Sequence, residues 1–320
     1  MTLPSALPER AAAEERTAVL AGALCYFFWG FLPLLFKAAA WAGASPFEIV
    51  AWRTVWSVPF ALALVLLARQ WPQVARVFAT PRVLGWLVLS ALLIGCNWSI
   101  FVWAVNAGHT LDASLGYYLN PLLSVAAGMI LFREKIGRAG WIAIVLAGTG
   151  VAVQTWAHGR LPLAALGMAI SFCLYGVIRK RVAADAQTGL LVECLILAGP
   201  ALAYGIWLQS TGAGHAAHPV TAMILFIGGP ATVAPLATFA WAARRMPLST
   251  LGFLQFIAPT MQFIIGVSFG ERLSPLNILA FVFIWAGVAV YAVTAWRKAR
   301  AAAVYRGHVS GEAASTSPQR

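Results

Sequence analysis

Two charged residues lie deep within apolar stretches of the chain, and either could take part in chemistry. They are Arg53 and Glu193. A charged side chain near the middle of a membrane helix costs about 2.5–3.5 kcal/mol on insertion scales, so it is expected to face a partner, a cavity or a substrate. The two residues are therefore candidates for binding and for proton transfer.

Arg53 has aromatic neighbours on its own predicted helix. Trp52 precedes it, and Trp56 follows three residues later, a spacing that places two helical side chains side by side. An indole ring beside a guanidinium favours a cation–π contact. We interpret Arg53 as a substrate-binding group or counter-charge in a central cavity. The alternative is a structural arginine, paired and capped near the membrane interface.

Glu193 could carry a proton, because a carboxylate buried without a partner can take up and release one. It is a candidate for proton coupling, and the alternative is an ion pair or hydrogen bond that fixes its helix. In the internal repeat described below, Glu193 falls opposite Trp52, one position from the counterpart of Arg53. Arg53 is therefore its expected protein partner.

Polar and aromatic side chains in four of the apolar runs could line the same cavity. The candidates for substrate binding, besides Arg53, are Tyr26, Trp29, Asn97, Trp98, Asn106, Tyr117, Tyr118, Asn120, Gln255 and Gln262. Flat apolar faces with a few polar groups suit an amphipathic organic molecule better than a bare ion. The alternatives are core packing or an interfacial belt for the aromatic residues, and helix–helix hydrogen bonds for the amides.

Other chemistry finds little support in the sequence. His215 and His218 have metal-like spacing but lie in a Gly/Ala-rich stretch, which favours a solvated loop. The four cysteines lie inside apolar runs with no C-x-x-C pair, so neither a disulfide framework nor a metal site is expected. The sequence has no P-loop, H-E-x-x-H or G-x-S-x-G motif, and we expect no cofactor and no enzymatic activity. The driving force would be an ion gradient, the membrane potential or the gradient of the substrate.

The composition places these residues in a membrane. Hydrophobic residues make up 61% of the 320 residues and charged residues 10%, whereas soluble domains carry about a quarter charged residues. The net charge of +12 comes from short basic clusters between apolar runs, with no basic patch interleaved with aromatic residues outside them. We therefore expect the lipid bilayer and a small-molecule substrate as partners, and no nucleic acid.

Ten apolar runs are each about long enough for a helix that crosses the hydrocarbon core, which predicts an all-α polytopic membrane protein. They cover residues 17–41, 46–69, 82–106, 110–132, 138–156, 161–180, 187–209, 219–243, 248–270 and 275–296. The polar segments 1–16 and 299–320 are predicted to be tails, the second of them disordered.

Basic residues predict the orientation. With the N-terminus in the cytoplasm, 18 of the 22 Lys and Arg residues fall on the cytoplasmic side, three (Lys37, Arg160 and Arg272) fall outside, and Arg53 lies within a span. Such an asymmetry follows the positive-inside rule. Both termini are therefore expected in the cytoplasm, and the protein in the inner membrane.

The chain contains an internal repeat. Pro121 matches Pro259 at a shift of 138 residues, and Gly150 matches Gly287 at a shift of 137. Each half then holds five helices, 17–156 and 161–296. Because five is odd, the second half enters the membrane from the opposite side, as in inverted-repeat transporters. Pro121 and Pro259 are hinge candidates, and static kinks are the alternative.

Several motifs resemble a known family. They are WRTVWS (52–57), NWSIFVWAVN (97–106), ASLGYYLNPLL (113–123), YGVIRK (175–180) and STLGFLQFIAPT (249–260). Over residues 17–296 the chain resembles the EamA domain of the drug/metabolite transporter superfamily, and most closely its RarD branch of chloramphenicol-sensitive or chloramphenicol-resistance permeases. The resemblance implies a secondary transporter, and more specifically an exporter of small metabolites or drugs that works by alternating access.

Two other classes remain open from the sequence. A polytopic membrane enzyme acting on lipid-linked substrates is the main alternative, and a channel is the other. The fifth and tenth runs, 138–156 and 275–296, carry small residues and little polar lining. We expect them at the periphery of the bundle, where they would support packing or a homodimer.

Overall fold

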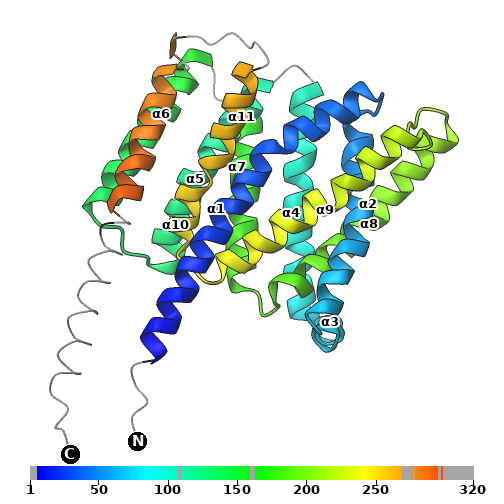
Figure 1. Ribbon diagram of the computed structural model, residues 1–320, viewed down its shortest axis with the longest axis horizontal. Coiled ribbons are helices and arrows are strands. Elements are labelled where there is room, and N and C mark those ends of the chain that lie inside the picture. The colour runs from blue at the N-terminus through cyan, green and yellow to red at the C-terminus, as the bar shows by residue number, and fades with distance from the viewer. Residues whose placement is uncertain are drawn as a thin grey trace, which may run out of the picture. The chain divides into compact units, whose positions relative to one another are not determined.

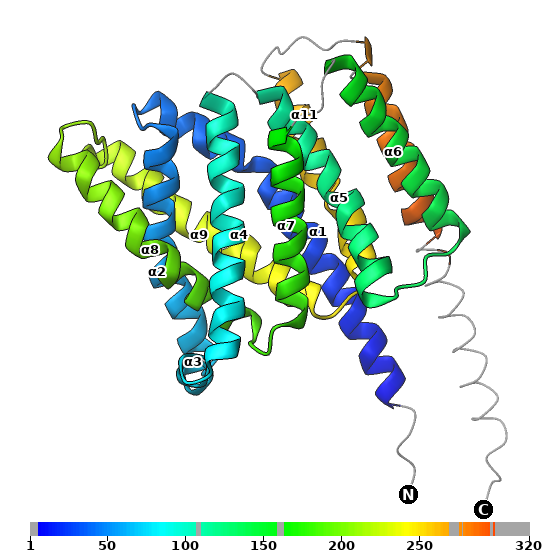
Figure 2. The same ribbon diagram turned by 180° about the vertical axis from the view of Figure 1, so that it is seen from behind.

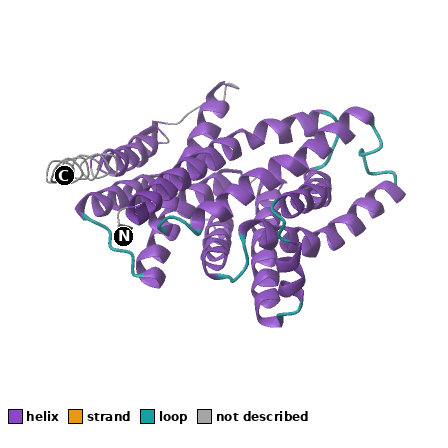
Figure 3. Cartoon of the chain, turned by 60° about the horizontal axis from the view of Figure 1, so that its bottom comes forward, coloured by secondary structure: helices purple, strands orange, loops and turns teal. Residues whose placement is uncertain are grey.

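The computed structural model describes residues 6–106, 110–158, 163–268, 275–276, 278–294 and 297. Over these ranges the chain is helical apart from short connections, and no strand occurs in them (Figure 1). The all-α prediction is therefore confirmed for the described part of the protein. Figure 3 shows how short the connecting loops are.

The helices follow the apolar runs. Their bounds are α1 Ala6–Trp41, α2 Pro46–Leu67, α3 Trp71–Phe78, α4 Pro81–Asn106, α5 Thr110–Phe132, α6 Arg138–His158, α7 Leu163–Arg181, α8 Ala186–Ser210, α9 Pro219–Ala243, α10 Leu248–Leu254 and α11 Ile257–Ser268, followed by an unlabelled helix Ile278–Thr294. Six of them, α1, α2, α4, α7, α8 and α9, are long and apolar enough to cross a membrane. Helix α3 was not predicted, because it is short and only part of it is apolar.

The ninth apolar run is not one continuous helix. It is divided into α10 and α11 at Gln255 and Phe256. Proline has no backbone N–H, so Pro259 cannot donate the helical hydrogen bond to the carbonyl of Gln255, four residues earlier. Its repeat counterpart Pro121 lies inside an unbroken α5. Of the two predicted hinge prolines, only Pro259 follows a break.

The described residues form two compact units. The first contains residues 1–134 and 161–272. Within it α2 packs against α8 and α9, α1 against α9 and α11, α5 against α7 and α10, and α4 against α7 and α8. Figure 2 shows α4, α5 and α7 from the other side. Tyr26, Tyr175 and Phe239 lie in its largest buried apolar cluster.

The second unit contains residues 135–160 and 273–320, and its described core is α6 against the helix Ile278–Thr294. Glycines allow the two backbones to approach closely. A Cβ atom at Gly150 would lie 2.6 Å from the carbonyl oxygen of Ala280, and one at Gly287 would lie 2.7 Å from that of Ala143. Small residues thus let these two helices pack closely, while the expected homodimer stays a prediction.

Enlarging either glycine should separate the two helices. Gly150→Leu or Gly287→Leu is expected to lower the free energy of unfolding by about 1–3 kcal/mol, the usual cost of overpacking. Gly148→Leu is the control, since a Cβ there meets nothing within 4 Å. Thermal unfolding in detergent measures the difference. Equal losses in all three variants would contradict a role for close helix packing, because leucine favours a helix more than glycine does and the control site has room for it.

Candidate functional site

The first unit encloses a cavity of about 420 Å³ among α1, α2, α4, α5, α7, α9 and the α10–α11 segment. At one end it is lined by the aromatic residues Tyr26, Trp29 and Phe172. At the other it reaches Lys37 near the end of α1 and Pro46 at the start of α2. The cavity therefore extends from an aromatic layer toward the α1–α2 connection.

Most of the predicted binding residues meet at this cavity. Those that line it are Tyr26, Trp29, Arg53, Asn97, Trp98, Tyr117, Asn120 and Gln255. Tyr118 is buried but is not among the lining residues. The side chains of Asn106 and Gln262 lie outside the described residues.

Sequence reasoning predicted two lining residues on α1 but missed the others on that helix and the one on α7. Phe36, Lys37 and Ala40 line the cavity together with Trp29. Their spacing from Trp29 places them on one helical face, and this periodicity is the signal that could have found them. Phe172 on α7 also lines the cavity, and nothing in its sequence context distinguishes it from a core residue.

Arg53 lies on α2 and is 5% exposed. Its guanidinium carbon lies 4.1 Å from the ring centroid of Trp98 and 5.5 Å from that of Phe36. Gly228 on α9 makes room for it, since a Cβ atom there would come within 2.8 Å of the Arg53 Cβ. The buried Nε atom has no hydrogen-bond partner within the described part of the chain. Arg53 thus stacks on aromatic rings, and its Nε donor has no partner among the described residues.

The expected contact between Arg53 and Trp56 is wrong. Trp56 packs instead against Phe226 on α9, with ring centroids 5.0 Å apart. The spacing of three residues placed both side chains on neighbouring parts of α2, but a long arginine side chain follows the cavity available to it. That cavity lies toward α1 and α4, where Phe36 and Trp98 are found.

Glu193 lies on α8, is 2% exposed and does not line the cavity. Its carboxylate pairs with Arg179 at 3.5 Å, accepts a hydrogen bond from Ser90 and lies 3.4 Å from the Tyr175 hydroxyl. The predicted pairing with Arg53 is wrong. A near match in the alignment of two repeats does not by itself bring the two residues into contact. The alternative interpretation, an ion pair that fixes the helix, has its partners in place.

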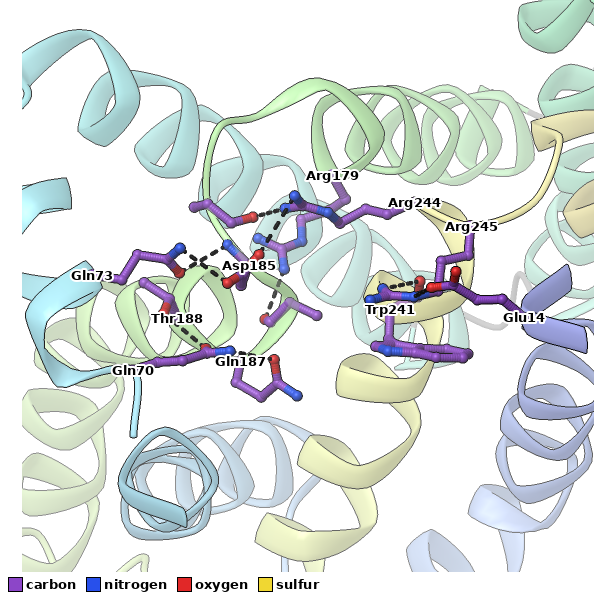
Figure 4. Close-up of polar contacts among 12 residues, drawn as sticks. Glu14, Gln70, Gln73, Arg179, Asp185, Gln187, Thr188, Trp241, Arg244 and Arg245 are labelled. Carbon is purple, nitrogen blue, oxygen red and sulfur yellow. Dashed lines mark hydrogen bonds and ion pairs between the residues drawn. The ribbon is translucent and has the colours of Figure 1, made fainter. Parts of the chain in front are cut away.

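A polar network joins α3 to the connection between α7 and α8 (Figure 4). The Gln73 amide donates to Asp185 at 3.0 Å and accepts from the Asp185 backbone N–H at 3.0 Å. Thr188 donates to Gln70 at 3.0 Å, and Arg244 pairs with Asp185 at 3.6 Å. These contacts hold together the C-terminal ends of α2 and α9 and the start of α8. They lie on the side of Tyr26, Trp29 and Phe172 that faces away from the cavity.

Glu134 follows α5 and caps α10. It accepts hydrogen bonds from the backbone N–H groups of Leu248 at 2.7 Å and Ser249 at 2.9 Å, and it pairs with Lys180 at 3.2 Å. Burial acts to raise the pKa of Glu134, but these hydrogen bonds and the lysine charge outweigh it and hold the pKa below its usual value. The resulting stabilisation is complete above the unfolded pKa of about 4.3 and is lost as the pH falls through the folded value.

Comparison with known proteins supplies the family. The profile of the EamA-like transporter family matches residues 16–156. Protein RarD of Salmonella typhi is 42% identical over 287 residues, which cover 89% of this chain and 97% of that protein. The chain belongs to the EamA-like transporter family and to its RarD proteins. The resemblance found in the motifs is thereby confirmed, and membership of a transporter family agrees with the several apolar helices long enough to cross a membrane.

Further relatives come from other bacteria. The uncharacterized transporter YojE of Bacillus subtilis is 34% identical over 90% of this chain and 98% of its own length. The chloramphenicol-sensitive protein RarD of Pseudomonas aeruginosa is 32% identical over 79% of this chain and 85% of its own length. A solved crystal structure at 20% identity superposes with a TM-score of 0.68, covering 88% of this chain and 98% of the other. This last likeness concerns the fold alone.

Proposed function

We propose that the protein is an inner-membrane secondary transporter that exports small organic molecules by alternating access. The cavity is the observation that carries the proposal. Its volume of about 420 Å³ lies within the 300–1,000 Å³ typical of sites for small organic ligands. Its walls combine aromatic faces with a few polar groups, the composition expected for an amphipathic substrate.

An aromatic floor, formed by Phe172, Tyr175 and Phe239, supports the alternating-access part of the proposal. Tyr175 and Phe239 are at most 1% exposed and stack with centroids 5.7 Å apart, and Phe172 lies 5.4 Å from Phe239. Beyond this floor come the Arg179–Glu193 pair and the Glu134–Lys180 pair. The cavity is thus closed at one end by several contacts, as one state of an alternating-access cycle requires.

Reciprocal contacts support the inverted repeat with its halves at 17–156 and 161–296. In the second unit, the contact of Gly150 with Ala280 is repeated by that of Gly287 with Ala143. Adding 137 to 143 gives 280, and adding 137 to 150 gives 287. Each contact is therefore the image of the other when the halves exchange places, which is the property of a two-fold axis.

A second pair of contacts, in the first unit, also supports the inverted repeat. Asn97 donates to Ser171 at 3.2 Å, and the thiol of Cys25 donates to the Pro235 carbonyl at 3.1 Å. A shift of 138 takes 97 to 235, and the shift of 146 between the YFFWG and FCLYG segments takes 25 to 171. The two halves differ at their hinge prolines. The helix is broken before Pro259, after α10, and is continuous at Pro121 in α5, which is the asymmetry expected when only one hinge is bent.

The predicted orientation of the chain determines on which side of the membrane the cavity opens. With both termini in the cytoplasm, the α1–α2 connection lies outside, so the cavity opens outward and the aromatic floor faces the cytoplasm. A reporter fused after Arg320 is expected to be active only if it works in the cytoplasm. Activity of a periplasmic reporter at the same position would reverse the orientation and with it the side of the cavity.

Cysteine accessibility tests alternating access. In a variant with the four native cysteines replaced by alanine, Asn120→Cys should react with a membrane-impermeant thiol reagent from the outer face at rest. Addition of substrate should make it reactive from the cytoplasmic face. Arg82→Cys, exposed at the start of α4, is the control and should react only from inside. Reactivity of Asn120→Cys from one face under every condition would contradict the mechanism.

Flux into sealed vesicles tests the transport function itself. Proteoliposomes should accumulate or release labelled compounds without forming a product. The first compounds to test include chloramphenicol, because the Pseudomonas aeruginosa relative carries that label. Turnover of a lipid-linked substrate to a new product in detergent would instead identify an enzyme.

A further inference from the structure

We propose that the substrates are small organic anions, each a carboxylate on an aromatic or branched apolar body, and that Arg53 is their counter-charge. The inference rests on the proposed transport function and names the chemical class that its cavity would accept. Three features of the cavity carry it: the sign of its charge, its unpartnered polar atoms, and its size and apolar walls.

The central charge of the described lining is positive. It belongs to Arg53, and no Asp or Glu occurs among the described residues that line the cavity. The ion pairs between described side chains do not include Arg53. An organic cation would meet like charge at Arg53, whereas an anion would meet opposite charge there in a medium that screens little.

Two residues that line the cavity carry polar atoms without partners. Arg53 Nε and Asn120 Oδ1 are both buried, lack a hydrogen-bond partner in the described chain and belong to lining residues. Leaving such atoms unpaired costs free energy that a bound ligand would recover. The rings of Trp98 and Phe36 lie beside the guanidinium, and the ion pairs between described side chains leave its charge without a carboxylate. A carboxylate matches a planar guanidinium with two oxygens.

The walls define the rest of the molecule. Trp29, Phe101 and Phe172 surround the space next to the charged end, so the ligand should carry an apolar body beside its acid group. A volume of about 420 Å³ is near the lower end of the range for ligand sites, which favours a compact molecule over a lipid or a peptide.

Charge also gives the transport step a direction. With no described carboxylate in the cavity to carry a proton across with the substrate, the anion would move with its charge. A membrane potential that is negative inside drives a free anion outward. This is the direction of the proposed export, and it needs no proton from Glu193, which lies outside the cavity.

A matched set of probes tests the inference on the full-length protein in proteoliposomes. Three skeletons are each supplied as acid, amide and amine: phenylacetate, phenylacetamide and benzylamine; indole-3-acetate, indole-3-acetamide and 3-aminomethylindole; 3-methylbutanoate, 3-methylbutanamide and isobutylamine. Binding is read from thermal shift, and transport from labelled flux under a potential imposed with potassium and valinomycin. At least one acid should bind about tenfold or more tightly than its own amide, the ratio expected for one charge-assisted hydrogen bond. Its flux should reverse when the potential is reversed.

The outcomes separate the inference from the function it rests on. Tighter binding and flux of amines or amides would overturn the anion class and leave the transporter standing. Absence of binding by all three acids would also overturn the class. Absence of flux for every probe and for chloramphenicol would count against the transport function itself.

Variants connect the preference to Arg53. Arg53→Gln should remove the difference between acid and amide, and Arg53→Lys should retain part of it. Arg82→Gln loses the same charge at an exposed site on α4 and should keep the wild-type ratio. An unchanged acid preference in Arg53→Gln would overturn the assignment. If that variant does not fold, the wild-type ratio of acid to amide still decides the class.

Discussion

Replacing Glu193 with alanine is expected to lower the free energy of unfolding by about 3–5 kcal/mol, because it leaves the charge of Arg179 buried without its partner. The Arg179 side chain is 0% exposed and the Glu193 side chain 3%, so water cannot replace the lost carboxylate. Arg179 keeps one bond, to the Ala186 carbonyl at 2.8 Å, which ties it to the start of α8. Chemical or thermal unfolding in detergent measures the loss.

A double variant separates the charge from the packing. Arg179→Met with Glu193→Leu removes both charges together and should recover most of the stability, because well-packed apolar residues replace buried pairs at little cost. Glu14→Ala is the matched control. This variant breaks the ion pair between Glu14 and Arg245. The Glu14 side chain is 58% exposed, so the variant should change stability by less than about 1 kcal/mol. Equal effects at the buried and exposed pairs would contradict the structural role of Glu193.

Glu193→Gln also decides between the two interpretations of this residue. As a proton carrier, the glutamine variant would fold and would lose any dependence of transport on a pH gradient. As an ion-pair residue, it would lose stability and leave that dependence unchanged. Because Glu193 is held by Arg179, Ser90 and Tyr175, we expect the second result.

Transport by Arg53→Ala is expected to fall by about 100-fold or more with membrane insertion retained, since the variant loses both the charge and the planar donor edge at the cavity. Arg53→Lys keeps the charge but loses the planar guanidinium that stacks on Trp98 at 4.1 Å. It should therefore lose transport by about tenfold. Initial rates in proteoliposomes with equal amounts of protein give the comparison.

The alternative role for Arg53 predicts a different pattern. A structural arginine replaced by alanine would remove the protein from the membrane, and the surviving fraction would transport at the wild-type rate. Arg82→Ala, exposed on α4, controls for the loss of a positive charge and should do neither. The amount of protein in the membrane fraction and the rate per molecule separate the two roles.

Much of the site could be predicted because several of its residues are polar and lie in otherwise apolar runs. Arg53, Asn97, Asn120 and Gln255 are polar residues in apolar runs, and all four line the cavity. Glu193 satisfied the same criterion and lies elsewhere. A buried polar residue shows that some partner must exist, but it does not show whether that partner is a cavity or another side chain.

The sequence by itself determined the all-helical architecture, most of the helix limits and the family, because hydropathy, span length and long motifs are properties of consecutive residues. Only the tertiary structure decided that Arg53 stacks on Trp98, that Glu193 pairs with Arg179, and that the ninth run is broken before Pro259. The first two depend on how each helix is rotated about its axis and on which helix lies opposite. A proline can either bend or break a helix, and the packing around it decides between the two.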